Sequence, residues 1–163
     1  MRLLLVRHAD AGDVDSARYP DDRLRPLTPD GEREHGAVAV ALARFGLTVT
    51  HVLTSPLTRA RQTAEITARA LGVADVMVVD ALGEGFLLEG VLAALSALPT
   101  SAVVVCVGHE PNISRFAATL LHGDGNLRLA FAKSAVMALD CDGPPAPGRA
   151  RLVFFVTPRE LVR

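Results

Sequence analysis

Long apolar segments are missing from this chain of 163 residues. No segment approaches the ~18 uninterrupted apolar residues that a membrane-spanning helix needs. The opening apolar run, Leu3 to Val6, is also too short for the core of a secretory signal. We therefore expect a cytoplasmic protein that does not interact with membranes.

Cysteine is scarce, and neither sign of charge dominates. The two cysteines, Cys106 and Cys141, form no disulfide framework or zinc-ligand spacing, and Cys106 lies in a valine-rich run typical of a buried thiol. Lysine and arginine total 17 against 18 acidic residues, a formal net charge of −1. No overall charge would recruit nucleic acid. With half of its residues hydrophobic, the chain is expected to form a single globular domain over residues 1–163.

Short apolar runs alternate with helical patterns along the sequence. Strands are expected near residues 2–6, 51–54, 76–79, 102–107, 135–139 and 152–156, and helices over 29–45, 55–71, 86–98 and 112–121. The last two strands follow one another across a Gly- and Pro-rich turn, so they should form an antiparallel hairpin at a sheet edge. This order predicts a three-layer α/β/α sandwich with a mostly parallel central sheet.

The first expected helix has recognisable ends. Thr28 can cap it and Pro29 suits its first position, while Gly46 is expected to end it. Its apolar stripe is expected to consist of Ala37, Ala41, Leu42 and Phe45. The polar segment before it, residues 10–29, is a long loop, and loops of that length in small domains are often functional.

Three expected strands end in residues suited to anion binding. The first ends at Arg7 and His8, the second leads into a helix that carries Arg59, and the fourth ends before His109. Because parallel strands bring their carboxyl ends to one edge of the sheet, these four side chains can converge. Arginine presents a fixed fork of donors that matches phosphate oxygens. The pattern therefore predicts a phosphate site with a histidine nucleophile.

These motifs resemble those of the histidine phosphatase superfamily, which has the phosphoglycerate-mutase-like fold. The matching segments are Arg7-His8, Ser55 to Thr63 with its Ser-Pro-x-x-Arg-Ala-x-Gln-Thr pattern, and Gly108-His109. The short chain and three further segments resemble the SixA branch of phosphohistidine phosphatases: residues 25–31, 108–112 and 131–135.

The resemblance implies a role for each matching residue. His8 would take the phosphoryl group onto a ring nitrogen, and water would then hydrolyse the intermediate. Arg7, Arg59 and His109 would bind the phosphoryl oxygens. Arg25 would be a further phosphate ligand. The other nitrogen of His8 should donate to a fixed acceptor, for which we expect a loop carbonyl.

A general acid is less clearly indicated by the sequence. Longer relatives place an acidic residue after the middle strand, where this chain has Glu84, although a charge at the start of a helix is a plainer interpretation of Glu84. Imidazole is a better leaving group than an alkoxide, so a phosphohistidine substrate needs little acid catalysis. Ala9 replaces a glycine that is frequent in the wider family, which should alter the loop only modestly.

Several functions remain compatible with these residues. The first hypothesis is a phosphatase that acts on phosphohistidine, and its substrate would then be a partner protein domain that contains phosphohistidine. The alternatives are a phosphatase for a small metabolite and a binding module that recognises phosphate without turnover. No cofactor is implied, and a metal is disfavoured because two arginines accompany the two histidines. The remaining histidines, His35, His51 and His122, are expected at the surface, as is Arg61.

Overall fold

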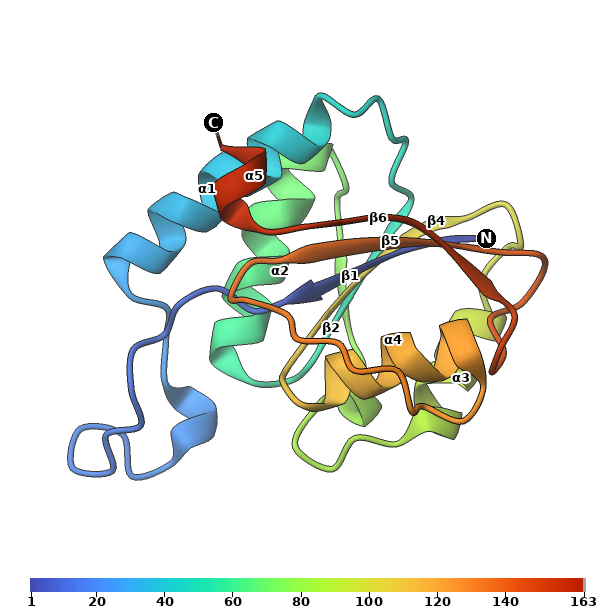
Figure 1. Ribbon diagram of the computed structural model, residues 1–163. Coiled ribbons are helices and arrows are strands. Elements are labelled where there is room, and N and C mark those ends of the chain that lie inside the picture. The colour runs from blue at the N-terminus through green and yellow to red at the C-terminus, as the bar shows by residue number, and fades with distance from the viewer. Residues whose placement is uncertain (163) are drawn as a thin grey trace.

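The computed structural model of the protein describes residues 1–162, and its ribbon is drawn in Figure 1. A single six-stranded sheet forms the centre of the molecule. Its strands are β1 (Arg2–Arg7), β2 (His51–Thr54), β3 (Val76–Val78), β4 (Val103–Gly108), β5 (Val136–Cys141) and β6 (Ala150–Val156). All six strands lie close to the segments that the sequence predicts, and no end is shifted by more than two residues.

The spatial order of the strands is β3-β2-β4-β1-β5-β6. Strands β1 to β4 are parallel to one another, whereas β5 is antiparallel to both β1 and β6. The predicted antiparallel hairpin therefore forms one edge of the sheet. Strand β1 lies between β4 and β5, so its carboxyl end is placed near the middle of the sheet edge.

Helices cover both faces of the sheet (Figure 1). They are α1 (Pro29–Ala43), α2 (Thr58–Leu71), α3 (Leu88–Ser96), α4 (Asn112–His122) and the short α5 (Pro158–Leu161), with 3-10 turns η1 (Asp22–Leu24) and η2 (Asp80–Leu82). Helices α1, α2 and α5 lie on one face, and α3 and α4 lie on the other. This is the expected three-layer α/β/α sandwich. Within residues 1–162, no helix is both long enough and apolar enough to cross a bilayer.

Strand β1 contributes to the core on both faces. Leu3 and Leu5 pack with α3 and α4, whereas Leu4 and Val6 pack with α1 and α2. Because successive side chains of a strand point to opposite faces, an uninterrupted apolar run is what a strand covered on both faces requires. The burial holds the end of β1 firmly on both sides. That the whole chain is one domain stays a prediction.

The helix α1 differs from its prediction in two respects. It begins as expected, with the Thr28 hydroxyl accepting a hydrogen bond from Gly31 N–H at 3.0 Å. However, it ends at Ala43 rather than at Gly46, so Phe45 lies beyond it and is 46% exposed. Among the predicted stripe only Leu42 is fully buried, and the buried face is instead made by Gly31, His35, Val38, Ala39 and Leu42. The apolar residues of this alanine-rich segment do not by themselves define its inner face.

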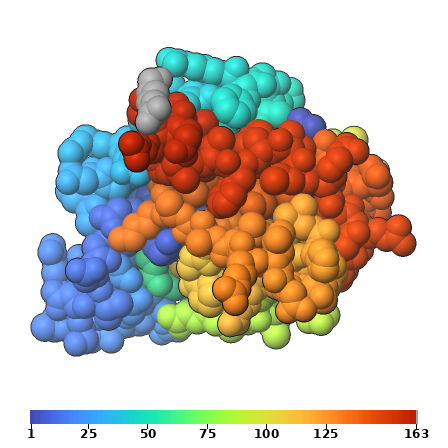
Figure 2. Space-filling model, viewed as in Figure 1, coloured from blue at the N-terminus to red at the C-terminus, as the bar shows by residue number. Residues whose placement is uncertain are grey.

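The long segment between β1 and α1 forms a lobe at the lower left of Figure 2. It contains η1, which the sequence does not predict. Two contacts anchor the start of α1 to the beginning of this segment: Thr28 N–H donates to the Asp10 carbonyl at 2.9 Å, and the Thr28 hydroxyl donates to the Asp10 carboxylate at 2.9 Å. The lobe therefore begins and ends close to the carboxyl end of β1.

Candidate active site

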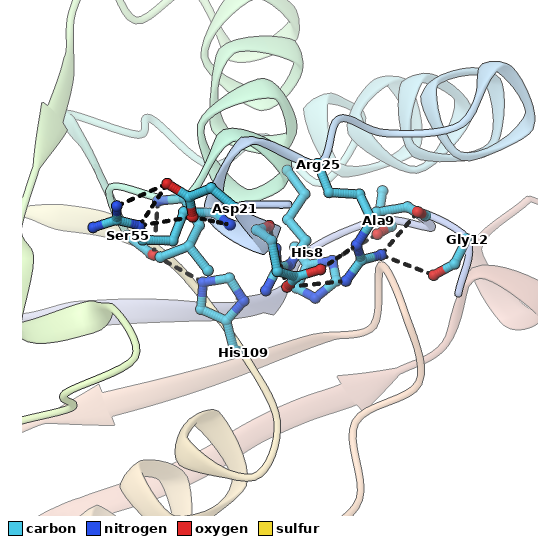
Figure 3. Close-up of polar contacts among 12 residues, drawn as sticks. His8, Ala9, Gly12, Asp21, Arg25, Ser55 and His109 are labelled. Carbon is cyan, nitrogen blue, oxygen red and sulfur yellow. Dashed lines mark hydrogen bonds and ion pairs between the residues drawn. The ribbon is translucent and has the colours of Figure 1, made fainter. Parts of the chain in front are cut away.

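Two histidine rings meet where β1 and β4 end. The register of this parallel pair aligns Arg7 with Gly108, so the next residues, His8 and His109, leave the sheet side by side. Their ring centroids are 5.0 Å apart, and both side chains are more than nine-tenths buried. Figure 3 shows the two rings at the sheet edge, with Arg25 and Ser55 close by. The predicted convergence of His8 and His109 is therefore present.

The tautomer of His8 follows from its hydrogen bond. His8 Nδ1 lies 2.7 Å from the carbonyl oxygen of Ala9, which can only accept a hydrogen bond. The proton of the neutral ring must then be on Nδ1, and Nε2 keeps a free lone pair. The acceptor is a loop carbonyl, as expected. Ala9 is itself held by a hydrogen bond from its N–H to the Thr63 hydroxyl of α2 at 3.0 Å.

Burial keeps both rings uncharged at neutral pH. Desolvation is the largest cause that lowers the pKa of His8 to about 4, and the positive charges of Arg59, Arg7 and Arg25 lower it further. Desolvation likewise lowers the pKa of His109 to about 3, with added repulsion from His8 and the arginines. A neutral imidazole is what nucleophilic attack by His8 requires. The same effects show that two or more guanidinium groups lie within electrostatic range of both rings.

Three buried nitrogens around the rings have no hydrogen-bond partner within residues 1–162. They are Arg7 Nε, Arg59 Nε and His109 Nδ1. The guanidinium groups are otherwise fixed: Arg7 Nη1 donates to the Phe131 carbonyl at 2.7 Å, and Arg59 Nη1 donates to the Asp22 carbonyl at 2.9 Å. Buried polar groups in folded proteins are almost always paired, so an unpaired set indicates a ligand site. A phosphoryl group carries the oxygens that could satisfy such donors.

Asp22 is a residue of this site that the sequence analysis did not identify. Its carboxylate accepts from Arg25 Nε at 2.7 Å and forms an ion pair with Arg59 at 3.2 Å. These guanidinium groups hold the pKa of the Asp22 carboxyl below its usual value. The spacing of Asp22 and Arg25 within a short turn could have signalled the first contact, but the contact with α2 depends on the fold.

Arg25 is buried next to these groups, but its donors face the loop. Besides Asp22, its Nη1 donates to the carbonyls of Ala11 and Gly12, each at 2.8 Å. These contacts tie the two ends of the lobe together (Figure 3). The role of a phosphate ligand stays a prediction for Arg25, whose charge does reach His8.

Glu84 occupies the turn between η2 and α3 and is exposed to solvent. Burial lowers the pKa of Arg59 overall, and the charge of Glu84 is a minor cause that opposes this lowering. Asp21 is the main cause that raises the pKa of Arg23, and Glu84 adds to it. Glu84 therefore lies within electrostatic range of both guanidinium groups. An exposed carboxylate in this position is compatible with a proton donor. That function of Glu84 stays a prediction.

His35 contradicts its predicted surface position, because it is fully buried between α1 and α2. Thr67 already donates its hydroxyl proton to the Thr63 carbonyl, so it accepts from His35 Nε2 at 2.8 Å. His35 Nδ1 then accepts from the Ser134 hydroxyl at 3.1 Å, and the Ser134 N–H donates to the Arg7 carbonyl. Burial lowers the pKa of His35 to about 4. His122 is exposed as expected, and His51 is half-buried.

Comparison with known proteins agrees with this geometry. The model of the histidine phosphatase superfamily (branch 1) matches residues 3–90, which is more than half of the chain. The chain belongs to the histidine phosphatase superfamily. It is therefore a phosphatase of that superfamily, and its fold is phosphoglycerate mutase-like.

Three proteins are similar to this superfamily member over most of its chain. An uncharacterised protein of Picosynechococcus sp. is 37% identical over 85% of this chain and 84% of its own. The structure of the protein histidine phosphatase SixA complexed with tungstate has a TM-score of 0.85 and 27% identity, covering 99% of each chain. The structure of the putative phosphohistidine phosphatase SixA from Nakamurella multipartitia has a TM-score of 0.72 and 30% identity, covering 96% of this chain and 95% of that one.

Within residues 1–162, no group of three or more His, Cys, Asp or Glu side chains is arranged so that it could hold a metal ion. The two histidines of the site are instead accompanied by arginines, whose positive charge acts on both rings. This chemistry suits an anion.

Proposed function

We propose that this protein is a metal-independent phosphatase that acts on phosphohistidine through a covalent intermediate on His8. The observation that carries the proposal is the unpaired set of Arg7 Nε, Arg59 Nε and His109 Nδ1 around a neutral His8 ring. The similarity to SixA structures over nearly the full length supports the same substrate class.

In the first step, the lone pair of His8 Nε2 would attack phosphorus, and the bond from phosphorus to the substrate imidazole would break. A substrate imidazole that carries a proton on its distal nitrogen leaves as a neutral molecule, so no strong acid is needed. The donors of Arg7, Arg59 and His109 would stabilise the charge on the transferring group.

In the second step, water would attack the phosphorus of phospho-His8. The Nδ1 proton, held by the Ala9 carbonyl at 2.7 Å, stays on the ring. Once phosphorylated on Nε2, the ring is therefore a cation and departs from phosphorus as neutral imidazole. Phosphate and the starting form of His8 are the products.

The decisive experiment is to trap the intermediate. Acid-free mass spectrometry after a short incubation with phosphoramidate or a phosphohistidine peptide should find one phosphoryl group on His8. The variant His8→Ala should lose turnover but still bind tungstate, because Arg7, Arg59 and His109 remain. A fully active His8→Ala protein would refute the proposal. Activity should also persist in EDTA, and its loss there would contradict metal independence.

A second candidate is a phosphatase for small phosphate esters, which the position of Glu84 near Arg59 favours. An alcohol leaving group needs a proton, and Glu84 would supply it. The variant Glu84→Gln should then reduce ester hydrolysis at least tenfold and leave phosphohistidine hydrolysis within about twofold. Equal small effects on both substrates would remove Glu84 from the mechanism. Binding of tungstate without hydrolysis of any substrate would instead indicate a binding module.

A further inference from the structure

Ser55 lies directly against the second histidine of the site and has no assigned role. It follows β2 and is completely buried, and its hydroxyl oxygen is 2.8 Å from His109 Nε2. The Leu57 N–H also donates to this oxygen at 3.2 Å. Figure 3 shows Ser55 on one side of the His109 ring and His8 on the other. The contact therefore bears on which nitrogen of His109 carries the proton.

Counting donors and acceptors selects one of the two neutral tautomers. Within residues 1–162, His109 Nε2 is the acceptor available to the Ser55 hydroxyl proton. If His109 Nε2 carried the proton and donated it to Ser55, that hydroxyl proton would be buried without an acceptor. An unsatisfied buried polar group costs about 1–3 kcal/mol. The balance therefore favours the arrangement in which Ser55 donates and His109 Nε2 accepts.

In this arrangement the proton of His109 is on Nδ1. That nitrogen is buried and has no partner within the described residues, as is also true of Arg7 Nε and Arg59 Nε. With Nδ1 protonated, all three are N–H donors. In the opposite tautomer Nδ1 would present a lone pair, which repels a phosphoryl oxygen.

We propose that Ser55 is a positioning residue that fixes His109 as the Nδ1–H tautomer and so completes a set of three donors for an oxyanion. The two histidines of the site then share a tautomer for different reasons. His8 is fixed by an acceptor, the Ala9 carbonyl, and offers a lone pair on Nε2. His109 is fixed by a donor, the Ser55 hydroxyl, and offers a proton on Nδ1. The kinetic consequence of this inference depends on the proposed function, whereas the tautomer itself does not.

The tautomer can be measured without substrate by two-bond ¹H–¹⁵N NMR spectroscopy of the ¹⁵N-labelled protein at about pH 8. In the wild type, His109 should show a protonated Nδ1 and a pyridine-like Nε2. The variant Ser55→Ala should shift His109 toward the Nε2–H form, which predominates in free neutral histidine. A protonated Nε2 in the wild type, or an unchanged tautomer in Ser55→Ala, would overturn the proposal.

Two further variants separate this effect from a loss of packing. Thr54→Val removes a neighbouring buried hydroxyl that donates to the backbone carbonyl of Ser55 and not to the His109 ring. This variant should leave the His109 signals unchanged. Ser55→Thr keeps the hydroxyl and should restore the Nδ1–H form. If Ser55→Ala does not fold, the wild-type spectrum alone decides the tautomer.

Kinetics test the functional consequence. Ser55→Ala should weaken tungstate binding and lower kcat/KM by about ten- to a hundredfold, as expected when an oxyanion donor is lost for much of the time. Ser55→Thr should recover most of both, and unchanged values in Ser55→Ala would contradict the positioning role. If the wild type has the predicted tautomer but hydrolyses nothing, the proposed function fails while the inference about Ser55 stands.

Discussion

Arg59 and Arg61 lie two positions apart in α2 but in different surroundings. Arg59 is 7% exposed and contacts Asp22, whereas Arg61 is exposed, as the sequence predicts. The variant Arg59→Ala should lower kcat/KM by at least a hundredfold, because the proposed mechanism loses a charged donor to the transferring phosphoryl group. Arg61→Ala should change kcat/KM by less than about twofold. Steady-state kinetics on a phosphohistidine peptide would measure both, and equal effects of the two substitutions would argue against a site at Arg59.

Single residues differ in how far the sequence predicts their environment. Arg7 and His8 directly follow an apolar run, so their place at a sheet edge can be derived from the local pattern. The surroundings of His35 cannot, because it follows Glu32, Arg33 and Glu34 in a segment that has the pattern of a solvated helix face. Its partners come from α2 and from the segment before β5. Such contacts exist only after the chain has folded, and so the surface prediction for His35 is wrong.

The start of α1 packs so closely on the segment after β1 that it requires glycine. A Cβ atom added to Gly31 would overlap the carbonyl group of Asp10, whose oxygen already accepts the Thr28 N–H. Because backbone rather than a flexible side chain is in the way, Gly31→Ala should destabilise the protein by about 2 kcal/mol or more. Urea unfolding would measure this loss.

Gly36 in the same helix provides a matched control. No atom lies within 4 Å of a Cβ added there. Gly36→Ala should therefore stabilise the protein by about 0.5–1 kcal/mol, as alanine does inside a helix. A loss of stability in Gly36→Ala as large as that in Gly31→Ala would show that the close approach to Asp10 is not the cause.

Whole elements follow from the sequence more reliably than their inner faces do. The continuous apolar runs of β1 and β4 identify strands covered on both sides, and Gly72, with φ of 71°, ends α2 where expected. In contrast, half of the predicted stripe of α1 consists of small alanines, which differ little from the other alanines of the helix in the free energy of burial. The position of α1 against α2 decides which of them face inward, and the buried His35 lies on that inner face. The short α5 was not predicted, since four residues carry no helical period.

Considered as a whole, the molecule buries three neutral histidines in two different places. His8 and His109 lie at the sheet edge, and His35 lies between α1 and α2. Burial lowers the pKa of His8 and His35 to about 4 and that of His109 to about 3. In the unfolded chain these groups have a pKa of about 6.5. As the pH falls below about 6.5, the unfolded state therefore binds protons that the folded state does not.

The fold should consequently lose stability between about pH 6.5 and pH 4. Each buried histidine lowers the free energy of unfolding by up to about 1.4 kcal/mol per pH unit in that range, so three together cost several kcal/mol by about pH 5. The paired carboxylates, such as Asp22 and Asp140, have lowered pKa values and act only at lower pH. Urea unfolding at intervals from pH 8 to pH 4.5 would isolate the histidine contribution. A stability that is flat from pH 7 to pH 5 would show that the three rings are not buried in their neutral form.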